Sequence, residues 1–181
     1  MKHFLSMSVY AGLLIGVAGL VYLRVGGIAG AVLFAFGLLC VVMSAAKLYT
    51  GKSGYLPVKQ IPRLLLMLAG NAVGCFLAAI IALYVTNDTL MANLSTILTA
   101  RDSASWIGLL VTSAGTGMIM TLAVYGAREK NYLPLLFGVP VFILCGLPQR
   151  VADAFYYALA LLNGRHTSTL LMAWLWALIG N

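Results

Sequence analysis

The sequence predicts an all-α polytopic membrane protein, and its composition and hydropathy give the reason. The chain of 181 residues is 62% hydrophobic and 8% charged, whereas about a quarter of the residues in a typical soluble domain are charged. The mean hydropathy is +1.01. Four apolar runs each reach the roughly 20 residues that a membrane-spanning helix needs. These runs are Phe4–Leu23, Val25–Ala46, Leu64–Asn87 and Ser103–Ala127.

A fifth crossing is predicted to be broken. The apolar runs Tyr132–Leu147, with 16 residues, and Val151–Leu162, with 12, are each too short to span. Joined through Pro148–Arg150, they make one crossing with an interruption near its middle. Irregular backbone at that depth is tolerated only where protein buries it or where it lines a wet cavity. We therefore expect the break to point inward, and we expect Thr169–Gly180 to supply a sixth segment.

Basic residues predict the orientation of the spans. By the positive-inside rule, the side that is richer in Lys and Arg faces the cytoplasm. We therefore expect a multi-pass protein of the plasma (inner) membrane with a cytoplasmic amino terminus. The richer side carries Lys2, Lys52, Lys59, Arg63, Arg128 and Lys130, and the poorer side carries Arg24, Arg101 and Arg165.

Several function classes are disfavoured. The net charge is +7, but the basic residues are scattered singly, without the basic arm or stacking platform that nucleic acid requires. Cys40, Cys75 and Cys145 lie inside apolar runs without CxxC spacing, so we interpret them as buried thiols and expect no disulfide or metal framework. No catalytic triad, zinc spacing or Walker loop is present. We therefore expect no enzyme activity, no cofactor and no nucleic-acid partner.

The sequence also contains an internal repeat. "GLLIGVAGLVYL" followed by "GGIAGAVLFAFGLLCVVMSAAKLYTG" is answered by "GLLVTSAGTGMIMTLAVY" followed by "LLFGVPVFILCGLPQRVADAF". Three spans separate the copies, so the second copy enters the membrane from the opposite side. Inverted repeats of this kind place substrate sites at broken helices near the midplane. We therefore predict one channel domain over residues 1–181, built from two inverted three-helix repeats at approximately 4–87 and 103–181.

Three stretches resemble the formate/nitrite transporter family. "FAFGLLCVVMSAAKLYTG" is similar to that family's second helix and following loop, and "LAGNAVGCFLAA" to its Gly-Asn-x-x-Gly third helix. "MTLAVYGAREKNYLPLLFGVPVFILCGLPQRVADAFYY" resembles its fourth and fifth helices. The resemblance implies an aquaporin-like arrangement with broken second and fifth helices. It also implies a homopentamer in the lipid bilayer with one pathway per protomer, which conducts small monovalent anions such as formate, nitrite or hydrosulfide.

The resemblance also implies roles for individual residues. Thr50 matches a loop threonine that offers the permeant anion a hydroxyl, and Gly117 falls where the family usually has Asn. Arg101 lies near a vestibule cation of the family. Phe34 and Leu38 match one hydrophobic constriction, and Leu48, Tyr49 and Phe142 match the other.

Four departures from the family pattern concern the mechanism. The family's central His is Gln149 here, its preceding acid is Pro148, its following Asn is Asp153, and its second-helix acid is Lys47. A glutamine amide donates a hydrogen bond but cannot titrate. We therefore expect passive or weakly proton-coupled passage, in which Lys47 and Arg150 supply the positive potential that attracts anions.

Alternatives remain for the charged residues and for the function. Arg150 and Asp153 share a helix face and neutralise each other in one interpretation, and Lys47 snorkels to the headgroups in another. In a third interpretation, Phe34, Leu38 and Phe142 are ordinary packing residues. A channel for a small neutral solute, or a non-conducting structural or assembly protein, are the alternative functions.

Overall fold

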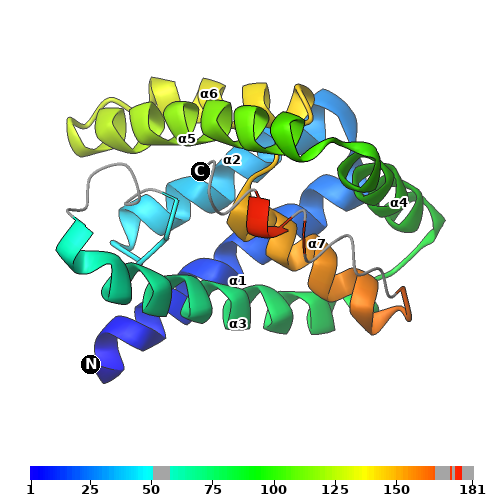
Figure 1. Cartoon of the computed structure of the whole chain (residues 1–181), viewed down its shortest axis with the longest axis horizontal. Coiled ribbons are helices and arrows are strands. Elements are labelled where there is room, and N and C mark those ends of the chain that lie inside the picture. Colours follow the sequence, from blue (N-terminus) through cyan, green and yellow to red (C-terminus); the bar gives the residue numbers. More distant parts are fainter. Residues whose placement is uncertain (51–57, 166–171, 173, 177–181) are drawn as a thin grey trace.

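The computed structural model describes residues 1–50, 58–165, 172 and 174–176, and helices are the regular secondary structure of this part. The described residues form seven α-helices and one short 3-10 helix, arranged as Figure 1 shows. The all-α prediction is confirmed. The elements are α1 (Lys2–Val25), α2 (Gly27–Met43), η1 (Val58–Gln60), α3 (Ile61–Leu83), α4 (Asp88–Ser103), α5 (Trp106–Arg128), α6 (Leu133–Leu144) and α7 (Arg150–Leu162).

Close contact between α1 and α3 forms one side of the molecule. Both helices use glycine where they meet: a β-carbon at Gly12 would overlap the Asn71 carbonyl, and one at Gly74 would overlap the Val9 carbonyl. Small residues let two backbones approach in this way inside a membrane, where the hydrophobic effect does not drive helices together. Gly12 and Gly74 are therefore packing positions.

The antiparallel helices α5 and α6 form the opposite side, and α2 and α7 lie between the two sides (Figure 1). α2 packs on α1 and α6, whereas α7 packs on α3 and α1. Neither inner helix is a complete crossing: α2 stops at Met43, and α7 starts at Arg150. The predicted breaks in the second and fifth helices are thus observed, the former within the residues described up to Thr50.

Both breaks begin with the same turn. After α2, the Ala45 N–H donates to the Val42 carbonyl and the Ala46 N–H to the Val41 carbonyl. After α6, Gly146 donates to Ile143 and Leu147 to Phe142 in the same pattern. This is the Schellman arrangement, which requires a left-handed residue just past the helix end. Ala45 and Gly146 supply it, with φ of 52° and 66°. The inverted repeat stays a prediction, and this turn does not test it, because the same turn also ends α5 at Lys130 and α7 at Gly164.

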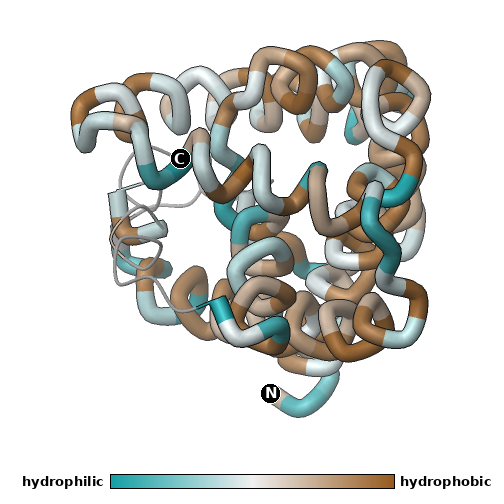
Figure 2. Tube along the Cα trace, turned by 90° about the vertical axis from the view of Figure 1, so that its right-hand side faces the viewer, coloured by the Kyte–Doolittle hydropathy of each residue, from teal (hydrophilic) through white to brown (hydrophobic). Residues whose placement is uncertain are grey.

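Among the residues that the structure describes, three helices are long and apolar enough to span a membrane, namely α1, α3 and α5, while α2 and α6 are shorter apolar helices. The expected run Val25–Ala46 gives an α-helix of only 17 residues, because Gly26, at φ 68°, separates it from α1. Figure 2 shows apolar residues along the outer helices. Most of the expected sixth segment, Thr169–Gly180, lies outside the described residues.

The helix α4 was not expected, since the sequence between Asn87 and Ser103 was interpreted as a connection. Asn87 caps this helix by accepting a hydrogen bond from the Leu90 N–H at 3.0 Å. One face buries a leucine on each of three successive turns and ends with Arg101. The helix was missed because its low overall hydropathy conceals the stripe, although a period of nearly four residues is typical of an amphipathic helix.

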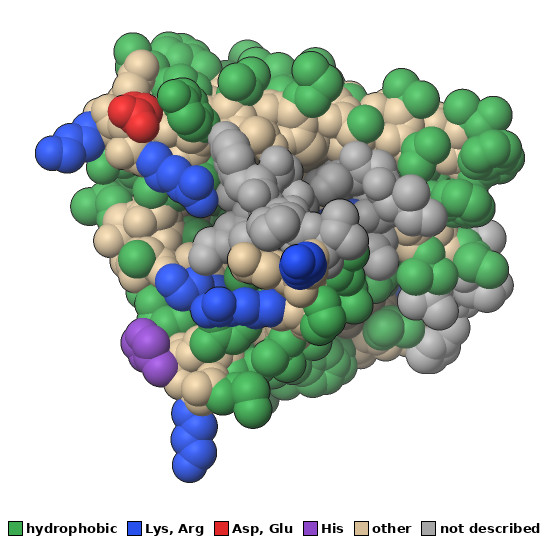
Figure 3. Space-filling view, turned by 60° about the vertical axis from the view of Figure 1, so that its left-hand side comes forward, with side chains coloured by type: hydrophobic (Ala, Val, Ile, Leu, Met, Phe, Trp, Pro, Cys, Tyr) green, Lys and Arg blue, Asp and Glu red, His purple; other side chains and the backbone are tan. Residues whose placement is uncertain are grey.

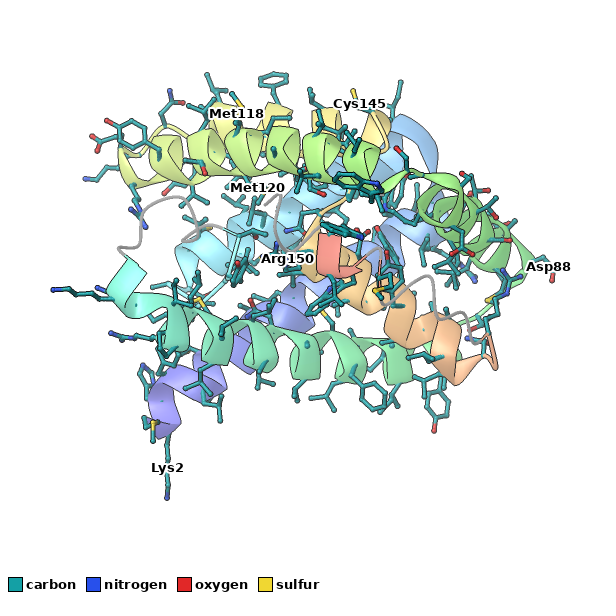
Figure 4. All side chains as sticks on the ribbon, in the orientation of Figure 1. Lys2, Asp88, Met118, Met120, Cys145 and Arg150 are labelled. Carbon is teal, nitrogen blue, oxygen red and sulfur yellow. The ribbon has the colours of Figure 1, made fainter. Side chains whose placement is uncertain are left out.

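Basic residues gather at one end of the molecule. The amino terminus, the start of α3 and the end of α5 lie together there (Figures 1 and 3). Figure 4 places Lys2 at this end and Asp88 at the other. The charge asymmetry that predicted the orientation is therefore present in three dimensions.

Candidate functional site between the helix breaks

The two helix breaks meet through a hydrogen bond between side chains. Gln149 Nε2 donates to Thr50 Oγ1 at 3.0 Å, although the residues are 99 positions apart. Both side chains are 2% exposed. The sequence predicted that the two breaks would face each other, and here they are in direct contact.

The Gln149 amide has a fixed orientation. Its Oε1 accepts a hydrogen bond of 2.6 Å from the Ala152 backbone N–H and so caps α7. A backbone N–H can only donate, so the oxygen must face Ala152 and the NH2 group must face Thr50. Gln149 therefore presents a permanent donor that neither gains nor loses a proton.

Asn71 of α3 holds the break after α2. Its Oδ1 accepts from the Tyr49 N–H at 2.9 Å, and its Nδ2 donates to the carbonyls of Lys47 at 2.9 Å and Ser8 at 2.8 Å. Backbone groups freed by a break need such partners because no water satisfies them inside the membrane. The resemblance included this asparagine but assigned it no role. A polar residue in the apolar run of α3 was the available signal.

Cys75 and Trp174 hold the second break. Cys75 Sγ lies 3.3 Å from the Gly12 carbonyl and 3.2 Å from the Val151 carbonyl, so it joins α1 to α7. Trp174 Nε1 donates to the Arg150 carbonyl at 3.1 Å. The prediction of buried thiols is correct for Cys75 but wrong for Cys145, which is exposed. Its position just past the end of α6 places it on the outside of this chain (Figure 4).

Two phenylalanine rings pack against each other beside the breaks. The rings of Phe34 and Phe142 meet edge to face, with centroids 6.2 Å apart. Both are almost fully buried. The resemblance grouped Phe34 with Leu38, whereas here Phe34 contacts Phe142, and Leu38 lines a cavity with Leu48; the constrictions themselves stay a prediction. The reason is that Phe34 and Leu38 lie one turn apart on α2 and so contact different partners.

Two cavities lie near the breaks, and they share no lining residue. The first, the Lys47 cavity, has a volume of about 240 Å³ and includes Lys47 and Arg128 beside Leu38 and Leu48. The second, the Arg101 cavity, has a volume of about 220 Å³; its lining includes Tyr22, Arg101, Phe142, Gln149, Asp153 and Tyr156. Since a water molecule occupies about 30 Å³ of liquid, each has room for a small ion with several waters. Gly117, half-buried on α5, lines neither cavity.

The charged groups pair differently from the sequence interpretation. Asp153 forms a salt bridge with Arg101 of α4, at 3.4 Å, a partner that the alternative pairing of Arg150 with Asp153 did not include. Arg150 points toward the first break, where its guanidinium lies 4.4 Å from the centre of the Tyr49 ring. Figure 4 shows Arg150 near the centre of the molecule, and the residue is fully buried. Lys47 lines a cavity, which favours a role there over snorkelling.

Comparison with known proteins now identifies the fold. The family model described as "Formate/nitrite transporter" matches residues 1–181. The chain belongs to the formate/nitrite transporter family. No curated protein sequence matches the chain.

Two solved structures have the same fold. One, described as a "Pentameric formate channel with formate bound", has a TM-score of 0.86 and 16% identity, and the match covers 99% of this chain and 90% of the other. Another, an "FNT family ion channel", has a TM-score of 0.85 and 19% identity, and the match covers 99% and 84%.

Family membership confirms three expectations. The protein is a multi-pass membrane protein of a channel and transporter family, its fold is that of the family, and it is not an enzyme. The match of Gln149 to the family's central histidine stays a prediction from the resemblance; the structure shows that the Gln149 amide is bound on both sides.

Proposed function

We propose that this chain forms a channel for small monovalent anions of the formate, nitrite and hydrosulfide class. The permeant passes from the Lys47 cavity, past Thr50 and Gln149, to the Arg101 cavity. The Gln149–Thr50 hydrogen bond carries this proposal, because it joins both broken helices at a buried point.

The amino-terminal end of α7 supports selectivity for anions. The positive end of the helix dipole favours negative charge at this position. Arg150 is the first residue of α7, and its guanidinium adds positive charge beside Thr50 and Gln149. Lys47 and Arg128 add positive charge at the Lys47 cavity, which raises the local concentration of anions.

The absence of an imidazole at position 149 supports passive or weakly proton-coupled passage. Histidine titrates near neutral pH and can protonate a weak-acid anion, whereas a glutamine amide cannot. The anion therefore passes the phenylalanine pair with its charge balanced by fixed donors and cations.

A homopentamer in the plasma membrane, with the amino terminus in the cytoplasm, completes the proposal. Large apolar side chains are exposed on α2, α5 and α6; among them are Ile28, Phe36, Val111, Met118 and Phe137. These surfaces suit neighbouring protomers or lipid. Native mass spectrometry in mild detergent tests the assembly, and a monomer or dimer would contradict it.

One observation favours a neutral solute as the second candidate. The Arg101–Asp153 pair neutralises charge in the Arg101 cavity, and a fixed amide suits a neutral permeant. Lys47 speaks against this candidate, because it places positive charge in the other cavity.

A flux panel in liposomes tests the function. The permeants are formate, nitrite, hydrosulfide, chloride and glycerol, and Gln149→Ala serves as the variant. We expect flux of the small anions that exceeds glycerol flux and falls in the variant. Glycerol flux alone would favour the neutral-solute channel, and no flux of any permeant would favour the non-conducting protein.

A further inference from the structure

The ion pair between Arg101 and Asp153 is long. Arg101 Nη2 lies 3.4 Å from Asp153 Oδ1, and Arg101 Nε lies 3.4 Å from Asp153 Oδ2. Charge-assisted hydrogen bonds of this type are usually about 2.7–2.9 Å. Both carboxylate oxygens therefore face the guanidinium edge, but neither is tightly bound.

A separate contact holds Arg101 in place. Its Nη1 donates to the Gly146 carbonyl at 2.8 Å, which is the shortest of its hydrogen bonds. Arg101 is 8% exposed and comes from α4, so this bond ties α4 to the break before α7. The guanidinium can thus change its anionic partner on the Nε and Nη2 edge without leaving its position.

Asp153 has other stabilisation besides Arg101. It lies in the first turn of α7, where the helix dipole favours a negative charge. Its carboxylate is therefore not held by Arg101 alone. Both residues line the Arg101 cavity together with Gln149, so an ion in this cavity lies beside both charged side chains.

We propose that Asp153 is a built-in competitor for the permeant anion, and that Arg101 exchanges between the two. This inference rests on the proposed anion pathway. An arriving anion takes the Nε and Nη2 edge of Arg101, and the return of Asp153 expels it. Conduction requires such weak binding, since an ion that is held tightly does not leave.

The geometry also selects a shape of anion. The edge that Asp153 occupies accepts two oxygen atoms in one plane, and a guanidinium fork recognises such carboxylate-like groups bidentately. Formate and nitrite are planar with two oxygens, whereas chloride and hydrosulfide offer one acceptor atom. The exchange therefore favours two-oxygen anions.

Asp153→Asn in the full-length chain tests the competition, with the exposed Asp102→Asn on α4 as the matched control. In liposomes we expect the half-saturation concentration for formate to fall by about five- to tenfold. A change of this size lies within the usual range of interaction energies between contacting residues. The maximal flux of formate should also fall. The half-saturation concentration for chloride should change less than that for formate. An unchanged or higher half-saturation concentration for formate, or an equal shift for chloride, would overturn the proposal.

Binding without transport separates this inference from the proposed function. We expect formate to raise the Tm of Asp153→Asn in detergent more than that of the parent, because formate replaces the missing carboxylate. The gain should vanish in the double variant Asp153→Asn/Arg101→Gln. The absence of any extra gain would reject the exchange even if the parent conducts anions.

Arg101→Lys provides a variant that keeps the buried charge pair, in case Asp153→Asn does not fold. A lysine is a point charge without a fork. We expect the parent's preference for formate over chloride to fall by about fivefold, within the range of coupled contacts, while chloride flux persists. The exposed Arg165→Gln, whose side chain also contacts α4, is the control. An unchanged preference in Arg101→Lys would contradict the proposal.

Discussion

Gln149 and Thr50 join the two helix breaks through a hydrogen bond of 3.0 Å, and the same Gln149 amide caps α7 through its oxygen. One side chain thus fixes the start of a helix and the contact between the two helix breaks. Its donor points toward Thr50 because its acceptor is already committed.

Asn71 should be essential for the first break. Asn71→Ala removes three hydrogen bonds to backbone groups, and each buried group left without a partner costs about 1–3 kcal/mol. We expect a loss of roughly 2–5 kcal/mol of stability on this basis, together with loss of flux. Thermal unfolding in detergent measures the first effect. Asn93→Ala is the control, since Asn93 Nδ2 makes one such bond, to the Leu23 carbonyl; an equal loss in both variants would refute the role of Asn71.

The shared turn at the two breaks gives a paired test. Ala45 is left-handed at φ 52°, a conformation that costs a non-glycine residue about 1–2 kcal/mol. We expect Ala45→Gly to raise the Tm and Gly146→Ala to lower it. A β-carbon at Gly146 meets no atom within 4 Å, so backbone strain alone should account for its effect. Shifts of the same sign in the two variants would show that the turns are not equivalent.

The Phe34–Phe142 contact should limit non-selective passage. Phe142→Ala removes one ring of the pair, and a hydrophobic constriction that loses bulk admits water and ions more easily. We expect anion flux to rise and selectivity over chloride to fall. Phe137→Ala, on the exposed face of the same helix, should leave both unchanged. Equal behaviour of the two variants would assign Phe142 to packing.

The sequence was sufficient for the features that depend on local composition. Long apolar runs predicted the spans, and the polar Pro148–Arg150 interruption predicted the second break, because the membrane penalises both polar residues and irregular backbone. The resemblance then aligned Gln149 and Thr50 with the centre of the family fold. The structure adds that these two side chains are in contact.

The features that the sequence did not predict depend on tertiary contacts. Spacing within α7 suggested that Asp153 pairs with Arg150, but α4 brings Arg101 to the carboxylate instead. The regrouping of Phe34 with Phe142 has the same origin, since it depends on how α2 packs against α6. Because α4 itself is weakly apolar, neither its presence nor its partner was evident from hydropathy.

The most direct test of the anion pathway through position 149 is the pH dependence of formate flux in the parent and in Gln149→His. Tyr22, Arg101, Asp153 and Tyr156 also line the cavity, but they are common to both proteins, so the difference between the profiles isolates position 149. After correction for the ionisation of formate, we expect the variant to gain a titration between about pH 5 and 8, where histidine titrates, and the parent to lack it. Identical profiles in the two proteins, or a steep titration over this range in the parent that the variant leaves unchanged, would contradict a pathway past Gln149.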